Sequence, residues 1–459
     1  MVNVDVLIAG GGPAGCSAAA ALSELGLRVL VADAGVDRTK QLAGELLHPS
    51  GVRDLERLGF DNPLQRSEVR SVQGFAVIDN AGGAPRVRLL PYGENRFGIA
   101  VEHAAMTEPL WEGLSGRPGV ERWRPARVSK LTRNDVRGIE VTVRKGDGAE
   151  EQVAARLLVA ADGRASPLRG LLGISEKRER LSTMLGALVD AEYLPHPGYG
   201  HLFIGGAAPI LAYEIDGGRA RVMVDLPAGT DADGLSRSPH LLSGLPVQLR
   251  EELLRRLRLE RPLMAANETR LAQRVAVQSA VLIGDAGGCC HPLSASGLAS
   301  CTRDALALQA ALQEAQGDCP RATQLYAKRR RAPQRTRIAL ASALYRAFSE
   351  PSAEMAALRA GLFRYWERSA DGRDVSMALL STDESRMSVM AREYARVVGY
   401  GLAAMAQARA GEFPAGFRRS WPAAWRLARS TLPHLRDTVQ GAFQDRVMSA
   451  SQSPRAGAK

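Results

Sequence analysis

Glycines with a fixed spacing near the N-terminus are the first residues in this chain whose pattern indicates chemistry. Gly10, Gly12 and Gly15 form a GxGxxG motif that follows an apolar strand predicted over residues 4–9. In such a motif the first glycine permits a tight turn, the second admits a pyrophosphate close to the backbone, and the third lets the next helix pack on the strand. An incidental glycine turn is the alternative reading.

The helix predicted after this turn supplies the other half of a phosphate site. Pro13 and Ala14 stand at its start, where unpaired N–H groups and the positive end of the helix dipole attract phosphate. A second strand then ends at Asp33, at the spacing where a carboxylate accepts ribose hydroxyls. The pattern therefore favours dinucleotide binding and leaves FAD and NAD both open.

Two later strand ends distinguish between these cofactors. Asp162 and Gly163 follow an apolar strand, and Gly284 and Asp285 follow the strand predicted over residues 281–283. An NAD site needs no further sugar-binding loops so far downstream, so we expect FAD. The alternative is that these carboxylates cap the helices that follow them.

Small residues fill the stretch after Asp285, and a helix begins near Pro292 and Gly297. Small side chains let the backbone pass close to a cofactor and leave room for dioxygen and a substrate. The positive end of the new helix can stabilise negative charge on a reduced isoalloxazine. We therefore expect the flavin ring to lie against this loop.

The order of these motifs resembles the para-hydroxybenzoate hydroxylase type of flavoprotein. Within that class the chain is similar to the squalene monooxygenase (squalene epoxidase) family over about residues 4–400. The similar segments are 43–60 (the GE-L-P-GG segment of the family), 198–229 (substrate-domain strands), 284–306 (GDA…HPL…GG) and 343–381. Pro91-Tyr92 resembles a Pro-Tyr pair of the family's substrate pocket, which makes Tyr92 a candidate catalytic residue. The other reading of Tyr92 is a strand tyrosine packed at a domain interface.

The resemblance implies an FAD-dependent monooxygenase. Reduced FAD would react with O2 to give a C4a-hydroperoxide, whose distal oxygen passes to an apolar unsaturated or aromatic substrate by epoxidation or hydroxylation. Electrons would come from NAD(P)H, either directly, which is slightly favoured, or through a separate reductase. The alternatives are an FAD-dependent reductase or saturase of prenyl or polyene double bonds, and a non-catalytic flavin- or lipid-binding protein. The sequence indicates no metal site and no nucleophile–His–acid set. We expect His48, His103 and His291 to be hydrogen-bonded structural residues.

The elements that would position these residues indicate an α/β fold. We expect a discontinuous Rossmann-like FAD-binding domain with an inserted β-sheet substrate domain, followed by a C-terminal helical region and a disordered tail. In that order the expected residues are 1–75, 99–177 and 271–318 for the FAD-binding domain; 76–98 and 178–270 for the substrate domain; 319–445 for the helices; and 446–459 for the tail.

Composition narrows the setting of the protein. The 459 residues carry a net charge of +11, with a dense basic cluster over residues 328–337. Without a zinc finger or an aromatic-rich RNA signature we expect no nucleic-acid partner. The cluster is a solvated helix face or a contact with anionic lipid. Five cysteines with no paired CxxC motifs fit a reduced, cytoplasmic setting.

No run approaches the roughly 18 apolar residues of a spanning helix. Trp421 and Trp425 lie among arginines near the C-terminus. They suit either a basic helix on the inner face of a membrane or a helix tucked against the protein. Peripheral membrane association is therefore one prediction for this chain.

Overall fold

The computed structural model describes residues 1–35, 42–66, 68–81 and 84–407. The first layer is an eight-stranded mixed sheet in the order β17-β18-β11-β1-β2-β8, with β10 paired to β11 and β9 paired to β10. Strands β18, β11, β1, β2 and β8 run parallel to one another, whereas the edge strand β17 is antiparallel to β18. The bounds are β1 (Val2–Ala9), β2 (Val29–Ala32), β8 (Val120–Trp123), β9 (Ala126–Asp135), β10 (Gly138–Lys145), β11 (Glu150–Ala160), β17 (Ala276–Val277) and β18 (Ala280–Leu282).

The register of this sheet brings distant parts of the chain to one edge. Ala9 pairs with both Ala32 and Ala160, and Ala160 also pairs with Leu282. Parallel strands have their carboxyl ends at the same edge, which is where open α/β sheets bind ligands. The residues after β1, β2, β11 and β18 therefore meet there.

Helices pack on this sheet through small side chains. The alanine run of α1 (Pro13–Ser23) is fully buried in a core that also holds Ala305 and Leu308 of α8 (Gly297–Glu314). Alanine lets two helices approach closely, so α1 fits between the sheet and α8. The remaining elements here are α2 (Pro49–Arg57), α3 (Asp61–Leu64), α4 (His103–Glu112), α5 (Pro167–Leu171) and the three-stranded sheet of β3 (Leu46–Leu47), β4 (Arg70–Val72) and β7 (Gly98–Ala100).

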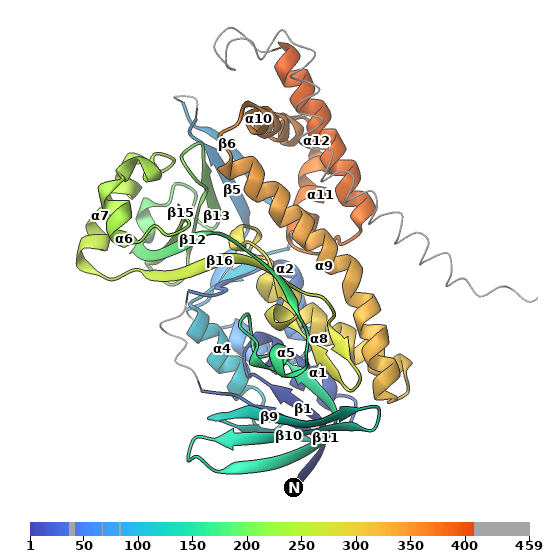
Figure 1. Ribbon diagram of the computed structural model, residues 1–459. Helices are drawn as coiled ribbons and strands as arrows, with labels where there is room; N and C mark the ends of the chain where they lie inside the picture. The colour runs from blue at the N-terminus through green and yellow to red at the C-terminus, as the bar shows by residue number, and fades with distance from the viewer. Residues whose placement is uncertain (36–41, 67, 82–83, 408–459) are drawn as a thin grey trace, which may run out of the picture.

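A second eight-stranded sheet lies above the first in Figure 1, in the order β19-β16-β12-β15-β14-β13-β5-β6. One face packs on α6 (Ala232–Arg237) and α7 (Val247–Leu259), and the other on the C-terminal helices. Short 3₁₀ turns occur at η1 (Ala191–Tyr193) and η2 (Pro239–Leu242). Its strands are β5 (Gly74–Asp79), β6 (Arg86–Pro91), β12 (Glu176–Asp190), β13 (Gly200–Ile204), β14 (Ile210–Glu214), β15 (Arg219–Pro227), β16 (Leu263–Ala272) and β19 (Gly288–Cys289).

Strand β19 connects the two layers. It belongs to the loop after β18 yet pairs with β16 of the second sheet, with Cys289 opposite Arg270. Two 3₁₀ turns, η3 (Gly284–Ala286) and η4 (Pro292–Ser294), bracket it before α8 begins. The loop that carries Asp285 is therefore fixed to both sheets.

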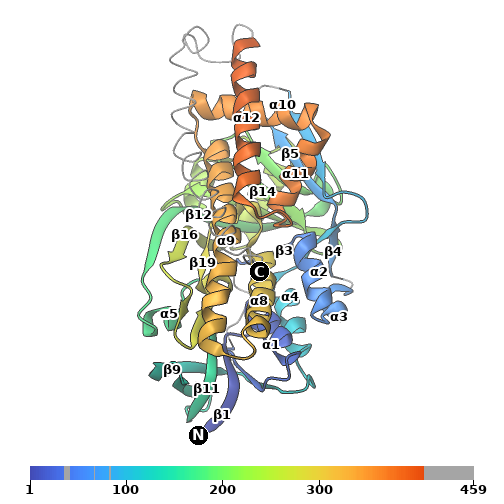
Figure 2. The same ribbon diagram turned by 90° about the vertical axis from the view of Figure 1, so that its right-hand side faces the viewer.

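The described chain ends in four helices. The 31-residue α9 (Cys319–Ser349) runs from the lower layer to the upper one, where α10 (Ala353–Arg368), α11 (Ala370–Leu380) and α12 (Met387–Gln407) gather (Figures 1 and 2). The predicted α/β class, with a Rossmann-like core and a helical C-terminal region, is confirmed. No helix in the described ranges is both long and apolar enough to cross a bilayer. The predictions for Trp421, Trp425 and the tail at 446–459 lie outside the described residues.

Candidate functional site

A cavity of about 890 Å³ opens where the strand ends of the first sheet face the second sheet. Its walls come from the turn after β1, the end of β2, the segment 42–46, the turn after β11, the loop 285–298 and the second sheet. Most of the predicted cofactor residues line this one cavity. They are Gly10, Gly12, Pro13, Ala14, Asp33, Asp162, Gly163, Asp285, Pro292 and Gly297. Three motifs far apart in sequence thus form a continuous slot.

Three glycines leave open space on the wall of the cavity. A Cβ built at Gly12, Gly163 or Gly297 meets no atom within 4 Å, and each of these residues lines the cavity. Gly12 precedes the first turn of α1 and gives no side-chain cap to its N–H groups. This is the cradle that a pyrophosphate on a helix N-terminus requires, so the residues present fit a dinucleotide.

Two other predicted glycines lie behind the wall. A Cβ at Gly15 would stand 1.8 Å from the carbonyl oxygen of Gly10, so the helix can approach the turn only with glycine there. Gly284 has a φ of +55°, and a Cβ would stand 2.9 Å from that of Ala14. Neither glycine lines the cavity, and both hold the motifs together by close backbone packing.

Asp33 is held as an oriented carboxylate at the nucleotide end. The Gly11 N–H donates to Oδ2 at 2.7 Å, while the Gly35 N–H and Arg124 Nε donate to Oδ1 at 3.0 and 2.9 Å. The Arg124 guanidinium also lies 4.0 Å from the Trp111 ring centroid. Sequence reasoning missed Arg124, whose only signal was its place directly after a strand. These contacts fix the orientation of the Asp33 carboxylate where it lines the cavity.

The two later aspartates behave differently. The carboxylate of Asp162 accepts hydrogen bonds from Ser166 Oγ at 2.6 Å and from the Leu168 N–H at 3.0 Å, so it holds the turn into α5, and burial raises its pKa. This is the capping role that the sequence left open. The carboxylate of Asp285 lines the cavity without a hydrogen-bond partner among the described residues. Asp285 is therefore the carboxylate available to a sugar-like hydroxyl chain.

The second sheet contributes an apolar part of the wall, formed by Met184, Leu211, Met223 and Tyr213, and Leu42, Leu46 and Leu298 face the same space. Within this surface, Glu45 accepts hydrogen bonds from Arg221 at 2.9 and 3.0 Å and from the Tyr213 hydroxyl at 3.2 Å. Both charged residues are buried, and burial raises the pKa of Glu45. The pair ties the segment 42–46 to β15.

His291 fixes the loop from the other side. Its Nδ1 accepts from the Leu293 N–H at 3.2 Å, and its Nε2 lies 3.4 Å from Asp225 Oδ1. Asn267 donates to the same Asp225 oxygen at 2.8 Å, and the imidazole stacks on Tyr345 with ring centroids 4.1 Å apart. These contacts are those of a hydrogen-bonded histidine, and the His291 side chain also lines the cavity.

Tyr92 does not line the cavity. It is 8% exposed and packs in the core between the second sheet and the C-terminal helices. Its hydroxyl lies 2.7 Å from Nδ1 of His48, whose Nε2 lies 2.8 Å from the Ser294 carbonyl oxygen. Burial lowers the pKa of His48 to about 4, so the ring is neutral, and Nε2 donates to Ser294. This geometry matches the interface reading of Tyr92.

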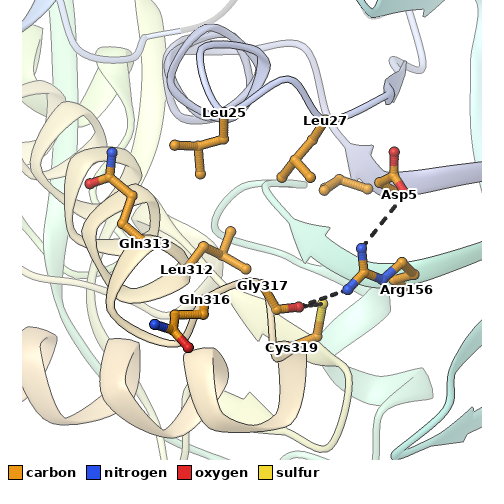
Figure 3. A pocket seen from close by; sticks show the side chains of 10 residues that line it. Asp5, Leu25, Leu27, Arg156, Leu312, Gln313, Gln316, Gly317 and Cys319 are labelled. Carbon is orange, nitrogen blue, oxygen red and sulfur yellow. Dashed lines mark hydrogen bonds and ion pairs between the residues drawn. The ribbon is translucent and has the colours of Figure 1, made fainter.

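A second hollow, of about 230 Å³, lies near the amino end of β1 (Figure 3). Arg156 crosses it, donating to the Gly317 carbonyl at 2.7 Å and lying 3.9 Å from the Asp5 carboxylate. None of the predicted cofactor residues lines it. The larger cavity at the opposite ends of the strands is therefore the candidate site.

Comparison with known proteins decides the family. The sequence model described as squalene epoxidase matches residues 154–415, which is more than half of the chain, and one described as an FAD binding domain matches residues 5–43. The chain belongs to the squalene epoxidase family. Together the two matches and the similar proteins make the chain an FAD-dependent monooxygenase.

Similar curated proteins include the squalene epoxidase erg1 of Aspergillus fumigatus, 28% identical over 80% of this chain and 79% of that protein. The squalene monooxygenase of Mus musculus is 26% identical, over 87% and 72%. Squalene epoxidase 3 of Arabidopsis thaliana is 26% identical over 67% of this chain, which spans only 59% of the plant protein.

Solved structures support the fold. The p-nitrophenol 4-monooxygenase PnpA of Pseudomonas putida superposes with a TM-score of 0.66 at 18% identity, covering 87% of this chain and 99% of that one. The anhydrotetracycline hydroxylase OxyS of Streptomyces rimosus gives 0.62 at 23% identity, over 84% and 77%.

Proposed function

We propose that this chain uses bound FAD to transfer one oxygen atom of O2 to a carbon–carbon double bond of an elongated apolar molecule. The observation that carries the proposal is the continuity of one cavity, in which a dinucleotide cradle opens directly onto a wall of methionine and leucine side chains. The names of the relatives point to squalene as the first substrate to test.

Different residues of the chain would bind different parts of FAD. The backbone at Gly12 and the first turn of α1 would hold the pyrophosphate, Asp33 the adenosine ribose, and Asp285 the ribityl chain. The loop from Pro292 to Gly297 would then lie along the ring. When bound, FAD supplies the redox chemistry that activates O2.

The second sheet would bind and orient the substrate. Thioether side chains adapt to irregular apolar shapes, so Met184 and Met223 suit a flexible hydrocarbon chain. Glu45 and Arg221 neutralise each other within this wall, so their pair presents no unbalanced charge to the substrate. An apolar substrate filling the cavity would also exclude water from the site of oxygen transfer, which prevents side reactions there.

The test is a turnover assay on the purified, FAD-loaded chain with NADH or NADPH, with and without an added flavoprotein reductase. A panel of squalene, shorter polyenes and phenolic lipids is compared in air and under nitrogen. The proposal predicts substrate-dependent O2 uptake matched by an equal amount of epoxide. Loss of an alkene under nitrogen would instead indicate a saturase, and a colourless protein that takes up no FAD would end the proposal.

A matched pair of variants tests the apolar wall of the cavity. Met184→Gln places an amide in the apolar wall, while Met264→Gln changes a methionine that is 40% exposed on β16. Burying an unpartnered amide costs about 1–3 kcal/mol, which corresponds to a roughly 5- to 150-fold rise in KM for a hydrocarbon. The FAD content of both variants, and the KM of Met264→Gln, should match those of the wild type.

Contact with a membrane surface is part of the same proposal, because an apolar substrate reaches the enzyme most readily from a lipid phase. The net charge of +11 supports attraction to anionic lipid. Co-sedimentation with phosphatidylserine vesicles, but not with phosphatidylcholine vesicles, is the expected result. Equal recovery in both pellets would contradict it.

A further inference from the structure

Arg337 is a buried cation that forms no ion pair with any residue that the structure describes. It lies on α9, is 7% exposed and lines the cavity. Its Nη2 donates to two neutral acceptors, the Gly288 carbonyl at 2.9 Å and the Gln334 side-chain oxygen at 3.2 Å. Its Nε is buried and has no hydrogen-bond partner among the described residues.

Other buried arginines of the chain are treated differently. Arg330, two turns earlier on α9, pairs with Asp304 at 2.7 Å, and Arg221 pairs with Glu45. In the described part of the chain no carboxylate lies within 4.0 Å of Arg337, and Asp285, which lines the same cavity, makes no ion pair with it. A desolvated guanidinium costs several kcal/mol when it is unpaired, so a fold that retains one is suited to an anion that arrives later.

The N-terminus of α8 points to the same conclusion. This helix has 18 residues, and its N-cap residue, Ser296, makes no capping hydrogen bond because its hydroxyl is bonded to that of Ser294 at 2.8 Å. Ser296, Gly297 and Leu298 all line the cavity, together with Arg337. The N–H groups and the dipole of this first turn add positive potential to the cavity that Arg337 also lines.

We propose that Arg337, together with the first turn of α8, stabilises the negative charge that the isoalloxazine ring gains when it is reduced. Transfer of a hydride adds two electrons and one proton to the neutral oxidised ring and leaves one net negative charge on it. Arg337 takes part in no bond making and is a positioning residue that acts through its charge. The inference rests on the proposed FAD site and adds a residue that sets how readily the cofactor accepts electrons.

The test measures the two-electron midpoint potential of bound FAD in the substrate-free holoenzyme. Arg337→Met and Arg337→Gln both remove the charge, Arg337→Lys retains it, and Arg331→Gln removes an exposed charge from the same helix as a matched control. We expect both neutral variants to bind reduced FAD at least tenfold more weakly relative to oxidised FAD. That corresponds to a potential lower by about 30 mV. Arg337→Lys should recover most of the loss, and Arg331→Gln should match the wild type.

The apolar methionine replacement leaves no unsatisfied donor, so it provides a folded neutral variant if the glutamine variant is unstable. An anionic substrate group is the other source of negative charge, and a long-chain fatty carboxylate titrated against the oxidised holoenzyme probes it. An unchanged midpoint potential of bound FAD in Arg337→Met overturns the inference, whether or not this variant also binds the fatty carboxylate more weakly. Failure of the wild-type chain to bind FAD would instead overturn the proposed function, so the two failures are distinct.

Discussion

Replacing Gly12 by alanine separates the stability of the fold from the binding of FAD. The backbone at Gly12 has φ −80° and ψ −173°, which alanine adopts without strain, and the added Cβ meets no protein atom within 4 Å. The methyl group therefore projects into the space that a pyrophosphate would occupy. The cost should appear in cofactor affinity, whereas the free protein loses at most about 1 kcal/mol because alanine caps helices less well than glycine.

The magnitude follows from the hydrogen bonds that the methyl group displaces. A hydrogen bond to a charged group contributes about 1.5–3 kcal/mol. Pushing the pyrophosphate away from the first turn of α1 removes at least one such bond. At about 1.4 kcal/mol per factor of ten, the Kd for FAD should rise by about 10- to 150-fold.

Two matched glycine variants frame the assay, in which FAD is titrated into the flavin-free chain and its fluorescence is followed. Gly170→Ala also adds a methyl group in open space, but away from the cavity, and should bind FAD normally. Gly15→Ala drives a Cβ into the Gly10 carbonyl and should lower stability by about 1–3 kcal/mol or more through overpacking. Wild-type FAD affinity in Gly12→Ala, or its unfolding without cofactor, would refute the reasoning.

Further predictions concern the buried charges and hydrogen bonds around the cavity. Arg221→Met leaves the Glu45 carboxylate buried without its partner and should destabilise the protein by about 3–5 kcal/mol, as measured by the denaturant midpoint. The double variant Glu45→Leu with Arg221→Met should recover most of that stability. Equal losses of stability in the single and double variants would contradict the ion-pair argument. The pKa of His48 is about 4 in the folded protein and about 6.5 in the unfolded chain, so the unfolded chain takes up the proton first as the pH falls. The His48 contribution to stability should therefore be fully present above about pH 6.5 and should fall by about 3 kcal/mol towards pH 4. His48→Gln, whose amide can still form hydrogen bonds with both neighbours, should lose less stability over this pH range in thermal melts. Identical pH profiles for the variant and the wild type would contradict this prediction.

Local sequence patterns determined the parts of this protein that depend on neighbours along the chain. The strand–glycine–helix order around Gly12 predicted the phosphate cradle, because the turn and the helix N-terminus are properties of a few adjacent residues. Two further strand ends, at Asp162 and Asp285, predicted the rest of the slot, since parallel strands share one edge. The resemblance over most of the chain predicted the family, which the comparisons confirm.

The tertiary structure alone decided which side chains meet across the cavity. Asp33 finds Arg124 at a separation of 91 residues, and Glu45 finds Arg221 at 176. The Tyr92 side chain packs in the core beside His48 and does not line the cavity. Such contacts are fixed by strand order and by the pairing of β19 with β16, which no local periodicity encodes. Whether a buried charge such as Arg337 is neutralised or left for a ligand depends on every element around it, and that becomes visible only when the chain is folded.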